Sequence, residues 1–286
     1  MGRRSAATAT STDARRARFA PLLRGRGLEI GALRKPFPVA DDVEVVYSDL
    51  LPPEEIDRHY PGGVHPDIVS DSESFPTVED DTFDFLIANH VLEHLTDPIR
   101  ALREWHRILG DGGLVLMALP DKRYTFDVHR RRTTLAHLIA DSSNNLTPRL
   151  KNYEHLVDWA THVEGLDPAS PEWCAWIEDR FETGFAVHNH VWVLQDILYL
   201  LLYLYQRRIA PFALARWNNT ALFGNEFIVL LRARKQPGRA RLASDVARLT
   251  TAVALAWLQN PWQVTQAACK RQLKKRKNPA HQERAG

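Results

Sequence analysis

The chain has 286 residues, of which 44% are hydrophobic and 25% charged, so it can form one large globular domain or one domain with an appendage. Its formal net charge of +2 is too small to indicate a nucleic-acid-binding protein. Two cysteines far apart, Cys174 and Cys269, indicate neither a disulfide framework nor a thiolate metal site. We therefore expect a cytoplasmic protein with no nucleic-acid partner.

The two ends of the chain are its basic parts. Residues 1–20 are rich in Arg, Ser, Thr and Ala and lack the apolar stretch of a secretory signal, so they are predicted to form a disordered tail, with a transit peptide as the alternative. Residues 238–286 are predicted to form a helical and basic C-terminal tail, with a helix at 242–258 and a basic run at 270–277. That run is either a solubilising end or a site of peripheral contact with anionic lipid.

From residue 27, short β-rich runs alternate with helix-like segments, and each run ends at a polar or turn residue. The runs are 28–30, 43–48, 68–70, 83–88 and 114–119. Before the fifth run, Asp97 and Pro98 predict the start of a helix, and the glycine-rich stretch 110–113 is expected to end it. This alternation predicts a parallel sheet whose ligands bind beyond the carboxyl ends of the strands.

The alternation is interrupted after the fifth run. Residues 121–189 are rich in charge, His and Trp and show no clear strand; a buried helix at 191–205 follows, and then strand candidates at 209–217 and 226–232. The helix is too short to span a bilayer, which takes ~20 residues. An insertion at the ligand-binding edge predicts a substrate-covering lid. We expect one domain over 21–237, with 121–189 as its insertion.

The turn after the first run reads Gly31-Ala32-Leu33-Arg34-Lys35-Pro36. A dinucleotide site needs further glycines so that the backbone can approach a pyrophosphate, and Leu33 and Arg34 would block that approach. S-adenosylmethionine has no phosphate and needs only the tight turn that Gly31 can form. The sequence therefore favours S-adenosylmethionine over a dinucleotide.

Acidic residues near the ends of the first three runs suit the polar groups of this ligand. Glu29 is expected to receive its ammonium group. Asp49 is expected to hold the ribose hydroxyls and Asp71 the adenine amino group. Asp49 would suit a nicotinamide cofactor equally well, so a nicotinamide-dependent oxidoreductase is an alternative.

Longer motifs carry a resemblance to a known family. They are LEIGA, YSDL, DIVSD, HNHVW, GNEFIVLL and the block from FDFLIANHVLEH to PDKRYTFD at 83–127. They resemble class I S-adenosylmethionine-dependent methyltransferases of the small-molecule type with a VLEH segment. PDKRYTFD, followed by a Thr-x-x-x-His stretch, resembles enzymes of glycan or secondary-metabolite pathways. The second and third glycines of the usual Gly-x-Gly-x-Gly signature are absent here.

The resemblance covers residues 27–234 and implies an α/β, Rossmann-like class I methyltransferase fold. This fold has a seven-stranded, mostly parallel sheet, whose last strand runs antiparallel beside the fifth, and here a helical lid insertion is added. An enzyme of this kind chiefly aligns the acceptor with the activated methyl group. A hydroxyl acceptor also profits from a general base.

The candidate site residues follow the strands of the predicted sheet. The expected cofactor-binding residues are Glu29, Gly31, Ala32, Asp49, Asp71, Asn89 and His90. The expected catalytic residues are His90, Glu93, His94, Asp121 and Tyr124. The expected substrate-binding residues are Lys122, Arg123, Asp127, His137, His188 and His190.

Several of these residues have alternative interpretations. Glu93 and His94 can instead order their loop through backbone hydrogen bonds. The spacing His90-x-x-Glu93-His94 resembles the metal ligands of small-RNA 2′-hydroxyl methyltransferases, although that cluster begins with Glu; the main expectation here is no metal. The arginines at 130–132 can hold a phosphate or carboxylate, or form a solvated helix face. Tryptophans at 159, 173 and 176 can stack on a sugar or pack the insertion.

The sequence thus predicts an S-adenosylmethionine-dependent methyltransferase that acts on a small molecule or glycan, by O-methylation. The binding-class alternative is a catalytically silent domain that binds S-adenosylmethionine or serves as a scaffold for a biosynthetic complex.

Overall fold

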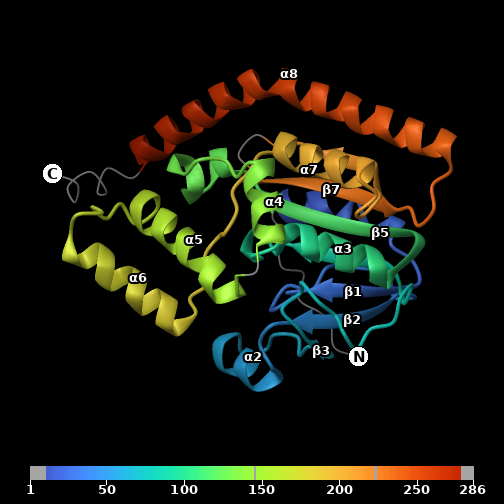
Figure 1. Cartoon of the computed structure of the whole chain (residues 1–286), viewed down its shortest axis with the longest axis horizontal. Helices are drawn as coiled ribbons and strands as arrows, with labels where there is room; N and C mark the ends of the chain where they lie inside the picture. The colour runs from blue at the N-terminus through green and yellow to red at the C-terminus, as the bar shows by residue number, and fades with distance from the viewer. Residues whose placement is uncertain (1–10, 145, 222–223, 278–286) are drawn as a thin grey trace.

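The computed structural model describes residues 11–144, 146–221 and 224–277, with side chains described between 14 and 258. Seven strands form one sheet in the order β3-β2-β1-β4-β5-β7-β6 (Figure 1). The strands are β1 (Arg26–Ile30), β2 (Glu44–Asp49), β3 (Ile68–Val69), β4 (Phe83–Asn89), β5 (Leu109–Pro120), β6 (Phe212–Asn218) and β7 (Glu226–Ala233). Six strands run parallel and β7 runs antiparallel between β5 and β6. The predicted fold class is confirmed.

The glycine-rich stretch 110–113 has a different role from the one that the sequence predicts. Helix α3 (Pro98–Ile108) ends before Gly110, and β5 already begins at Leu109. The pairing of β4 with β5 shifts register here. Gly112 has φ +82°, and a side chain at Gly113 would meet two backbone carbonyl oxygens at 2.9 and 3.2 Å. The glycines therefore permit an irregular start of β5 rather than ending the helix.

The main hydrophobic core lies on one face of the sheet. Residues of β5 alternate, so that Val115, Met117 and Leu119 point into this core while Leu116 and Ala118 point to the other face. Helices α3, α7 (Leu194–Gln206) and α8 (Arg239–Lys277) complete the core. The start of α3 is the predicted one, because the Asp97 side chain accepts a hydrogen bond from the Arg100 N–H. Helix α2 (Pro53–His59) connects β2 to β3.

The opposite face is covered by the N-terminal segment and by the loop after β1. Phe19, Leu23 and Phe37 pack there against Phe85 of β4. Residues 11–20 differ from the predicted disordered tail, since they contain α1 (Ser11–Ala17) and lead into the 3-10 helix η1 (Ala20–Leu22). Arg16 of α1 donates a hydrogen bond to Glu226 at the start of β7. Residues 1–10 of that prediction lie outside the described residues.

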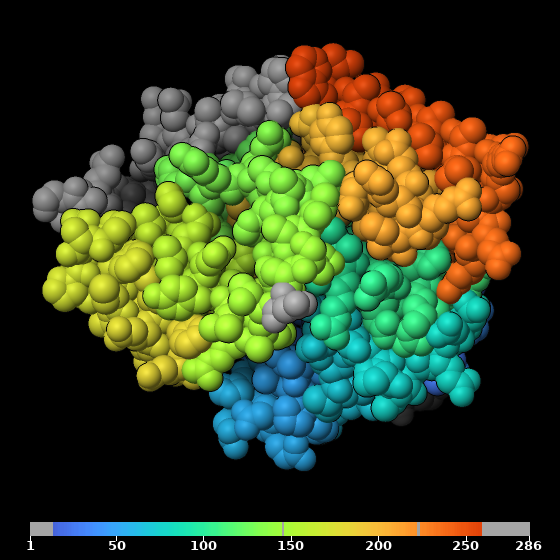
Figure 2. Space-filling model, viewed as in Figure 1, coloured from blue at the N-terminus to red at the C-terminus, as the bar shows by residue number. Residues whose placement is uncertain are grey.

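The insertion is helical. It contains η3 (Lys122–Tyr124), η4 (Phe126–His129), α4 (Leu135–Ser143), α5 (Pro148–His162) and α6 (Pro171–Thr183). Helices α5 and α6 share a small core of Leu156, Ala160, Ile177 and Val187. They lie beyond the end of the sheet toward which β1 and β2 point (Figure 1). In Figure 2 the insertion forms a yellow-green lobe on one side of the molecule.

The C-terminal helix is longer than predicted and belongs to the fold. Helix α8 extends from Arg239 to Lys277, and Leu249, Ala252 and Val253 are buried against the rest of the core. The basic run 270–277 is part of this helix, but its side chains lie outside the described ones. Within the described part of the chain, we find no helix with the length and apolar content to cross a bilayer.

Candidate functional site

The turn after β1 has the tight geometry that the sequence predicts. Gly31 adopts φ +67°, a conformation that favours glycine, and its N–H donates to the Ser48 carbonyl at 2.8 Å. A Cβ at this position would contact Val91, in the loop after β4, at 3.4 Å. Ala32 follows and is buried. Gly31 thus lies where β1, β2 and the NHVLEH segment meet.

Glu29 is buried beneath this turn. Its two carboxylate oxygens accept hydrogen bonds from the Phe37 N–H at 2.9 and 3.0 Å, and its exposed fraction is 2%. Burial raises its pKa to about 7, although the Phe37 bond acts in the opposite direction. In this structure the carboxylate fixes the loop after β1, and its role toward a ligand ammonium group stays a prediction.

Two acidic residues close β2 and β3. Asp49 is partly buried, accepts a hydrogen bond from the Leu51 N–H at 3.0 Å, and has a pKa raised by burial. Asp71 is exposed and accepts from the N–H groups of Glu73 and Ser74. Since β3, β2, β1 and β4 are neighbours, both carboxylates lie at the same edge as Gly31.

Two polar atoms at this edge have no partner among the residues that the structure describes. The Ser48 hydroxyl and the Asn89 side-chain oxygen are buried and make no hydrogen bond. Buried polar atoms are normally paired, so such atoms indicate a missing ligand. They lie at the ends of β2 and β4, on either side of β1, and the alternation along the strands points them to opposite faces of the sheet.

His90 bridges two carboxylates after β4. Its Nε2 lies 2.8 Å from Glu226 Oε2, and its Nδ1 lies 3.3 Å from Glu93 Oε1. Burial alone would lower the pKa of His90, but hydrogen bonds and charge from Glu226 and Glu93 raise it to about 9. His90 is therefore a cation at neutral pH, whereas the sequence favours it as a residue of the cofactor pocket and also names it among the candidate bases. Glu226 also accepts from Arg16.

A second histidine arrangement involves Glu93, His94 and His188. His94, in the 3-10 helix η2 (Leu92–His94), has Nδ1 2.9 Å from the Val187 carbonyl, and His188 has Nδ1 2.8 Å from Asp127. Each ring thus donates through Nδ1 and keeps its Nε2 lone pair. The metal-binding or proton-accepting atoms of Glu93, His94 and His188 lie within 4.8 Å of one another.

Glu93 is the charged centre of this arrangement. It is fully buried, and neither carboxylate oxygen has a hydrogen bond of good geometry. Burial raises the pKa of Glu93, but the hydrogen bond and charge of His90 have the larger effect and lower this pKa. Glu93 is therefore ionised between His90 and His94.

The predicted residues after β5 are largely engaged with one another. Asp121 is fully buried and accepts from Arg123 at 2.8 Å and from Thr220 at 2.7 Å. Lys122 is buried and donates to the Val128 carbonyl. Burial raises the pKa of Tyr124, which is partly buried. In this structure Asp121, Lys122 and Arg123 hold the loop together, and their direct roles in catalysis and substrate binding stay predictions.

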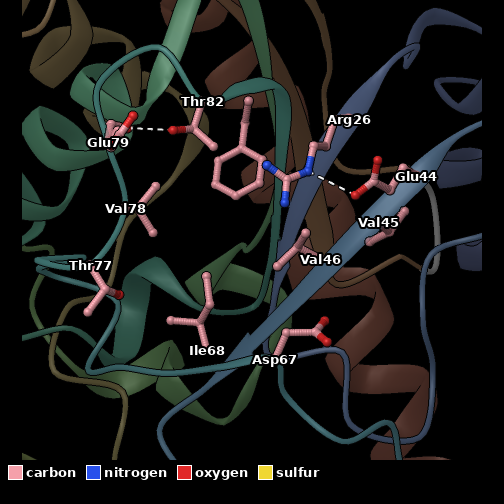
Figure 3. A pocket seen from close by; sticks show the side chains of 11 residues that line it. Arg26, Glu44, Val45, Val46, Asp67, Ile68, Thr77, Val78, Glu79 and Thr82 are labelled. Atoms are coloured by element: carbon pink, nitrogen blue, oxygen red, sulfur yellow. Dashed lines mark hydrogen bonds and ion pairs between the residues drawn. The ribbon is translucent and has the colours of Figure 1, made fainter.

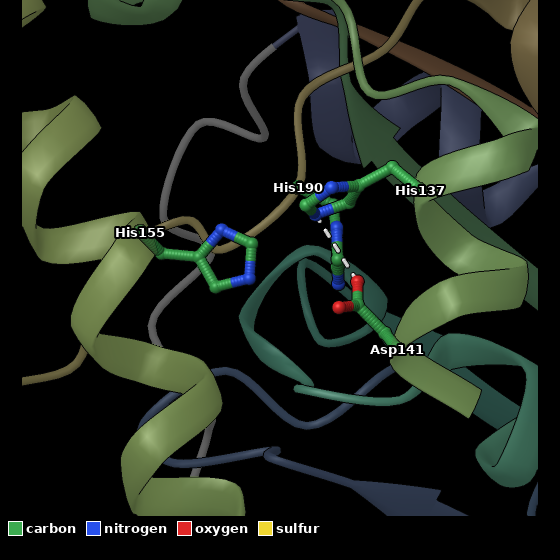
Figure 4. Close-up of side chains that lie close together, drawn as sticks. All are labelled: His137, Asp141, His155 and His190. Atoms are coloured by element: carbon green, nitrogen blue, oxygen red, sulfur yellow. Dashed lines mark ion pairs between the residues drawn. The ribbon is translucent and has the colours of Figure 1, made fainter. Parts of the chain in front are cut away.

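The insertion also brings four residues together in a second cluster. His137 and Asp141 on α4, His155 on α5 and His190 before α7 have ligand-type atoms within 4.8 Å of one another (Figure 4). Burial, followed by the charge of His137, lowers the pKa of His155 to about 3. Only His137 and His190 were singled out from the sequence. Asp141 has a sequence signal, because it lies four residues after His137 on one helix face.

One cavity of the molecule lies away from these residues. Its volume is about 660 Å³, and its lining includes Arg26, Glu44 and Phe83, which begin β1, β2 and β4 (Figure 3). It therefore lies at the amino ends of the strands. Ligands of such sheets bind at the carboxyl ends, so this cavity is not the candidate cofactor site.

A comparison with protein families identifies the family of this chain. A family model described as a methyltransferase domain matches residues 12–183, which is more than half of the chain. The chain therefore belongs to the methyltransferase domain family. It is a methyltransferase, and S-adenosylmethionine is its cofactor. The unpartnered atoms of Ser48 and Asn89 are compatible with this ligand.

The solved structures that match this chain are distant from it in sequence. A protein from Pyrococcus horikoshii OT3 is 16% identical, with a TM-score of 0.43 over 79% of this chain and 93% of its own. An S-adenosylmethionine-dependent methyltransferase from Methanosarcina mazei is 16% identical, with a TM-score of 0.40 over 74% and 93%. One from Thermotoga maritima is 17% identical, with a TM-score of 0.41 over 79% and 89%. No curated protein sequence matches the chain.

Proposed function

We propose that the protein transfers the methyl group of S-adenosylmethionine to a hydroxyl oxygen of a small molecule or glycan. The observation that carries this proposal is the pairing of His188 with Asp127 beside Glu93 and His94. A histidine oriented by a carboxylate is a general base, and a hydroxyl acceptor profits from one more than an amine or carbanion does.

The proposed cofactor site is the carboxyl edge of β1, β2, β3 and β4. The turn at Gly31 and Ala32 faces the amino-acid portion, Asp49 the ribose and Asp71 the adenine. Asn89 and Ser48 supply further polar atoms, and Glu29 shapes the turn from below. The cofactor supplies a methyl group that is already activated by the sulfonium, so the chain must chiefly position the acceptor.

The proposed base is His188. Its Nδ1–H donates to Asp127, which leaves the Nε2 lone pair to take the acceptor's hydroxyl proton. Burial raises the pKa of Asp127, but the bonds from His188 and Arg130 outweigh it and lower that pKa. Asp127 therefore stays ionised and stabilises the imidazolium that forms. A base of this kind contributes roughly 10² to 10⁴ in rate.

An exposed aromatic ring marks the proposed acceptor side. Phe126 on η4 is 52% exposed, and its ring centroid lies 4.8 Å from that of His188 and 5.0 Å from that of Trp159. An exposed aromatic face beside the base suits the apolar face of a sugar ring. Arg130 and Arg132 are paired with acidic side chains, which supports a neutral acceptor over a phosphorylated one.

The test is release of S-adenosylhomocysteine in the presence of sugars, glycans and phenolic or aliphatic alcohols. We expect at least one hydroxyl acceptor to be methylated on oxygen. His188→Gln should lower kcat by about 10² or more, with cofactor affinity unchanged. The control is His162→Gln, an exposed histidine paired with Asp158 on α5.

Three results would contradict the proposal. Methylation of nitrogen or carbon alone would exclude O-methylation. Cofactor binding without turnover of any acceptor would favour the catalytically silent or scaffold alternative. Tighter binding of a nicotinamide cofactor than of S-adenosylmethionine would favour an oxidoreductase.

A further inference from the structure

We propose that His137, Asp141, His155 and His190 form a binding site for a divalent transition-metal ion of the Zn²⁺ type, separate from the Glu93 cluster. Three imidazoles and one carboxylate are a ligand set typical of Zn²⁺ in proteins. Their ligand atoms lie within 4.8 Å of one another (Figure 4). The sequence-based expectation was that the protein holds no metal, so this proposal departs from it.

The buried ring of His190 is the strongest indication of a ligand. The side chain is fully buried, and neither ring nitrogen makes a hydrogen bond to the described residues. The backbone carbonyl of Leu95 comes near the ring, but outside hydrogen-bonding geometry. A buried imidazole with both nitrogens unpaired is costly, and a metal ion on one nitrogen would remove most of that cost.

The other three side chains converge on the same point from two helices. His137 and Asp141 are one turn apart on α4, with Nε2 and Oδ2 3.1 Å apart. The same Asp141 oxygen makes no hydrogen bond. His155 on α5 faces His190, with ring centroids 4.9 Å apart. Figure 4 shows the four side chains close together, with His155 to one side and the rings of His137 and His190 overlapping in this view.

The four ligand atoms would have to move only a short distance toward one another to bind an ion. Tetrahedral Zn²⁺ has bonds of about 2.0–2.1 Å to nitrogen and oxygen, which places its ligand atoms roughly 3.4 Å apart. The pair from α4 already has this spacing, and the remaining atoms must approach by roughly 1 Å, which side-chain rotations can supply.

An entry path and the local charge are also compatible with an ion. A cavity of about 280 Å³ opens onto His137, His155 and Asn189. Arg130, Arg131 and Arg132 also line this cavity, but Arg130 is paired with Asp127 and Asp158, and Arg132 with Asp196. Lys151 donates to the backbone carbonyl of Asp141 and leaves its carboxylate to the ion. Asp141 thus supplies the negative charge that the ion requires.

Four protein ligands close the coordination sphere, which is typical of a structural metal site. The ion would join α4, α5 and the segment before α7. The hydrophobic core shared by α5 and α6 is small, and the binding energy of an ion would compensate for the limited stability that this core provides. The same segment carries His188, so the ion would also help to hold the proposed base in place.

The experiment uses the full-length protein, stripped with a chelator and titrated with Zn²⁺, with Co²⁺ as a spectroscopic probe. We expect one tightly bound ion per chain, a tetrahedral Co²⁺ absorption spectrum and a higher melting temperature with Zn²⁺. His155→Ala should weaken Zn²⁺ binding by about 100-fold or more, since even loss of an outer-shell partner costs 10- to 100-fold. Asp141→Asn keeps the side chain's shape and should also weaken binding.

His94→Ala is the matched control, because it removes a histidine from the other cluster, and His162→Ala removes an exposed one. Both should bind Zn²⁺ as the unmodified protein does. Undiminished binding in Asp141→Asn and His155→Ala would overturn the proposal, as would loss of binding in His94→Ala. If the variants fail to fold, the unmodified protein still decides, because absence of a tetrahedral Co²⁺ spectrum excludes the site.

Discussion

At the scale of single residues, the charged network around His90 is the most consequential feature of the candidate site. His90 lies between Glu93 and Glu226, and both carboxylates are almost fully buried. Buried charges are stable only when they are matched, so the network depends on the proton that His90 carries. The backbone of His90 is left-handed, with φ +56°. This strained conformation directs the imidazole ring into its position between the two carboxylates.

We predict a pH-dependent loss of stability in His90→Gln. The pKa of His90 rises from 6.5 to about 9 on folding, so its stabilisation is fully present below pH 6.5 and is lost as the pH rises through 9. His90→Gln should therefore have a lower free energy of unfolding than the unmodified protein. This difference should be about 3 kcal/mol larger at pH 6.5 than at pH 10. Urea unfolding at both pH values measures this, with exposed His65→Gln as the control. A difference that does not change with pH would contradict the protonated state.

We also predict that Asp49→Ala weakens S-adenosylmethionine binding by roughly tenfold or more, because a bidentate hydrogen bond to the ribose is lost. The fold should be unaffected, since Asp49 is only partly buried and bonds locally to Leu51. Calorimetric titration measures the affinity, with exposed Asp41→Ala as the control. Equal affinity in both variants would exclude the ribose role.

At the scale of the elements, helix α3 shows how a local signal controls the site. Asp97 caps the helix, and its own N–H donates to Glu73 in the loop after β3. The cap therefore joins the loop that carries Asp71 to the helix that follows NHVLEH. Local capping chemistry is readable from sequence because it depends on residues within one turn.

We predict that Asp97→Ala lowers the free energy of unfolding by about 1–2 kcal/mol, because a helix N–H loses its acceptor. Asp97→Asn keeps an acceptor at the same position and should cost less. The midpoint of urea unfolding measures both variants. An equal loss in the two would assign the effect to the negative charge, which lies 3.9 Å from Lys151, and not to the cap.

At the scale of the whole molecule, α8 is a layer of the fold and not a detached tail. It crosses the upper side of the molecule over α7 (Figure 1). Leu249 on its inner face is fully buried, while Leu255 is 43% exposed. The sequence predicted the helix, but it did not predict that the helix packs against the core.

We predict that Leu249→Ala lowers the free energy of unfolding by about 2–5 kcal/mol, the usual cost of a cavity in a packed core. Leu255→Ala, on the same helix, should change it by less than about 0.5 kcal/mol. Thermal or urea unfolding of the two variants makes the comparison. Equal small effects would show that α8 does not contribute to the core.

The alternation of strands and helices, the turn at Gly31 and the cap at Asp97 could be predicted from the sequence, because hydrophobic period, backbone freedom and capping act over a few residues. Which polar residues meet depends on the folded chain. Asp127 and His188 are 61 positions apart, and Glu226 reaches His90 across 136 positions. Whether a carboxylate is free or paired depends on such distant neighbours and on burial, which spacing along one chain does not encode. For that reason the strands were predictable, whereas the charge of His90 and the partners of Asp141 were not.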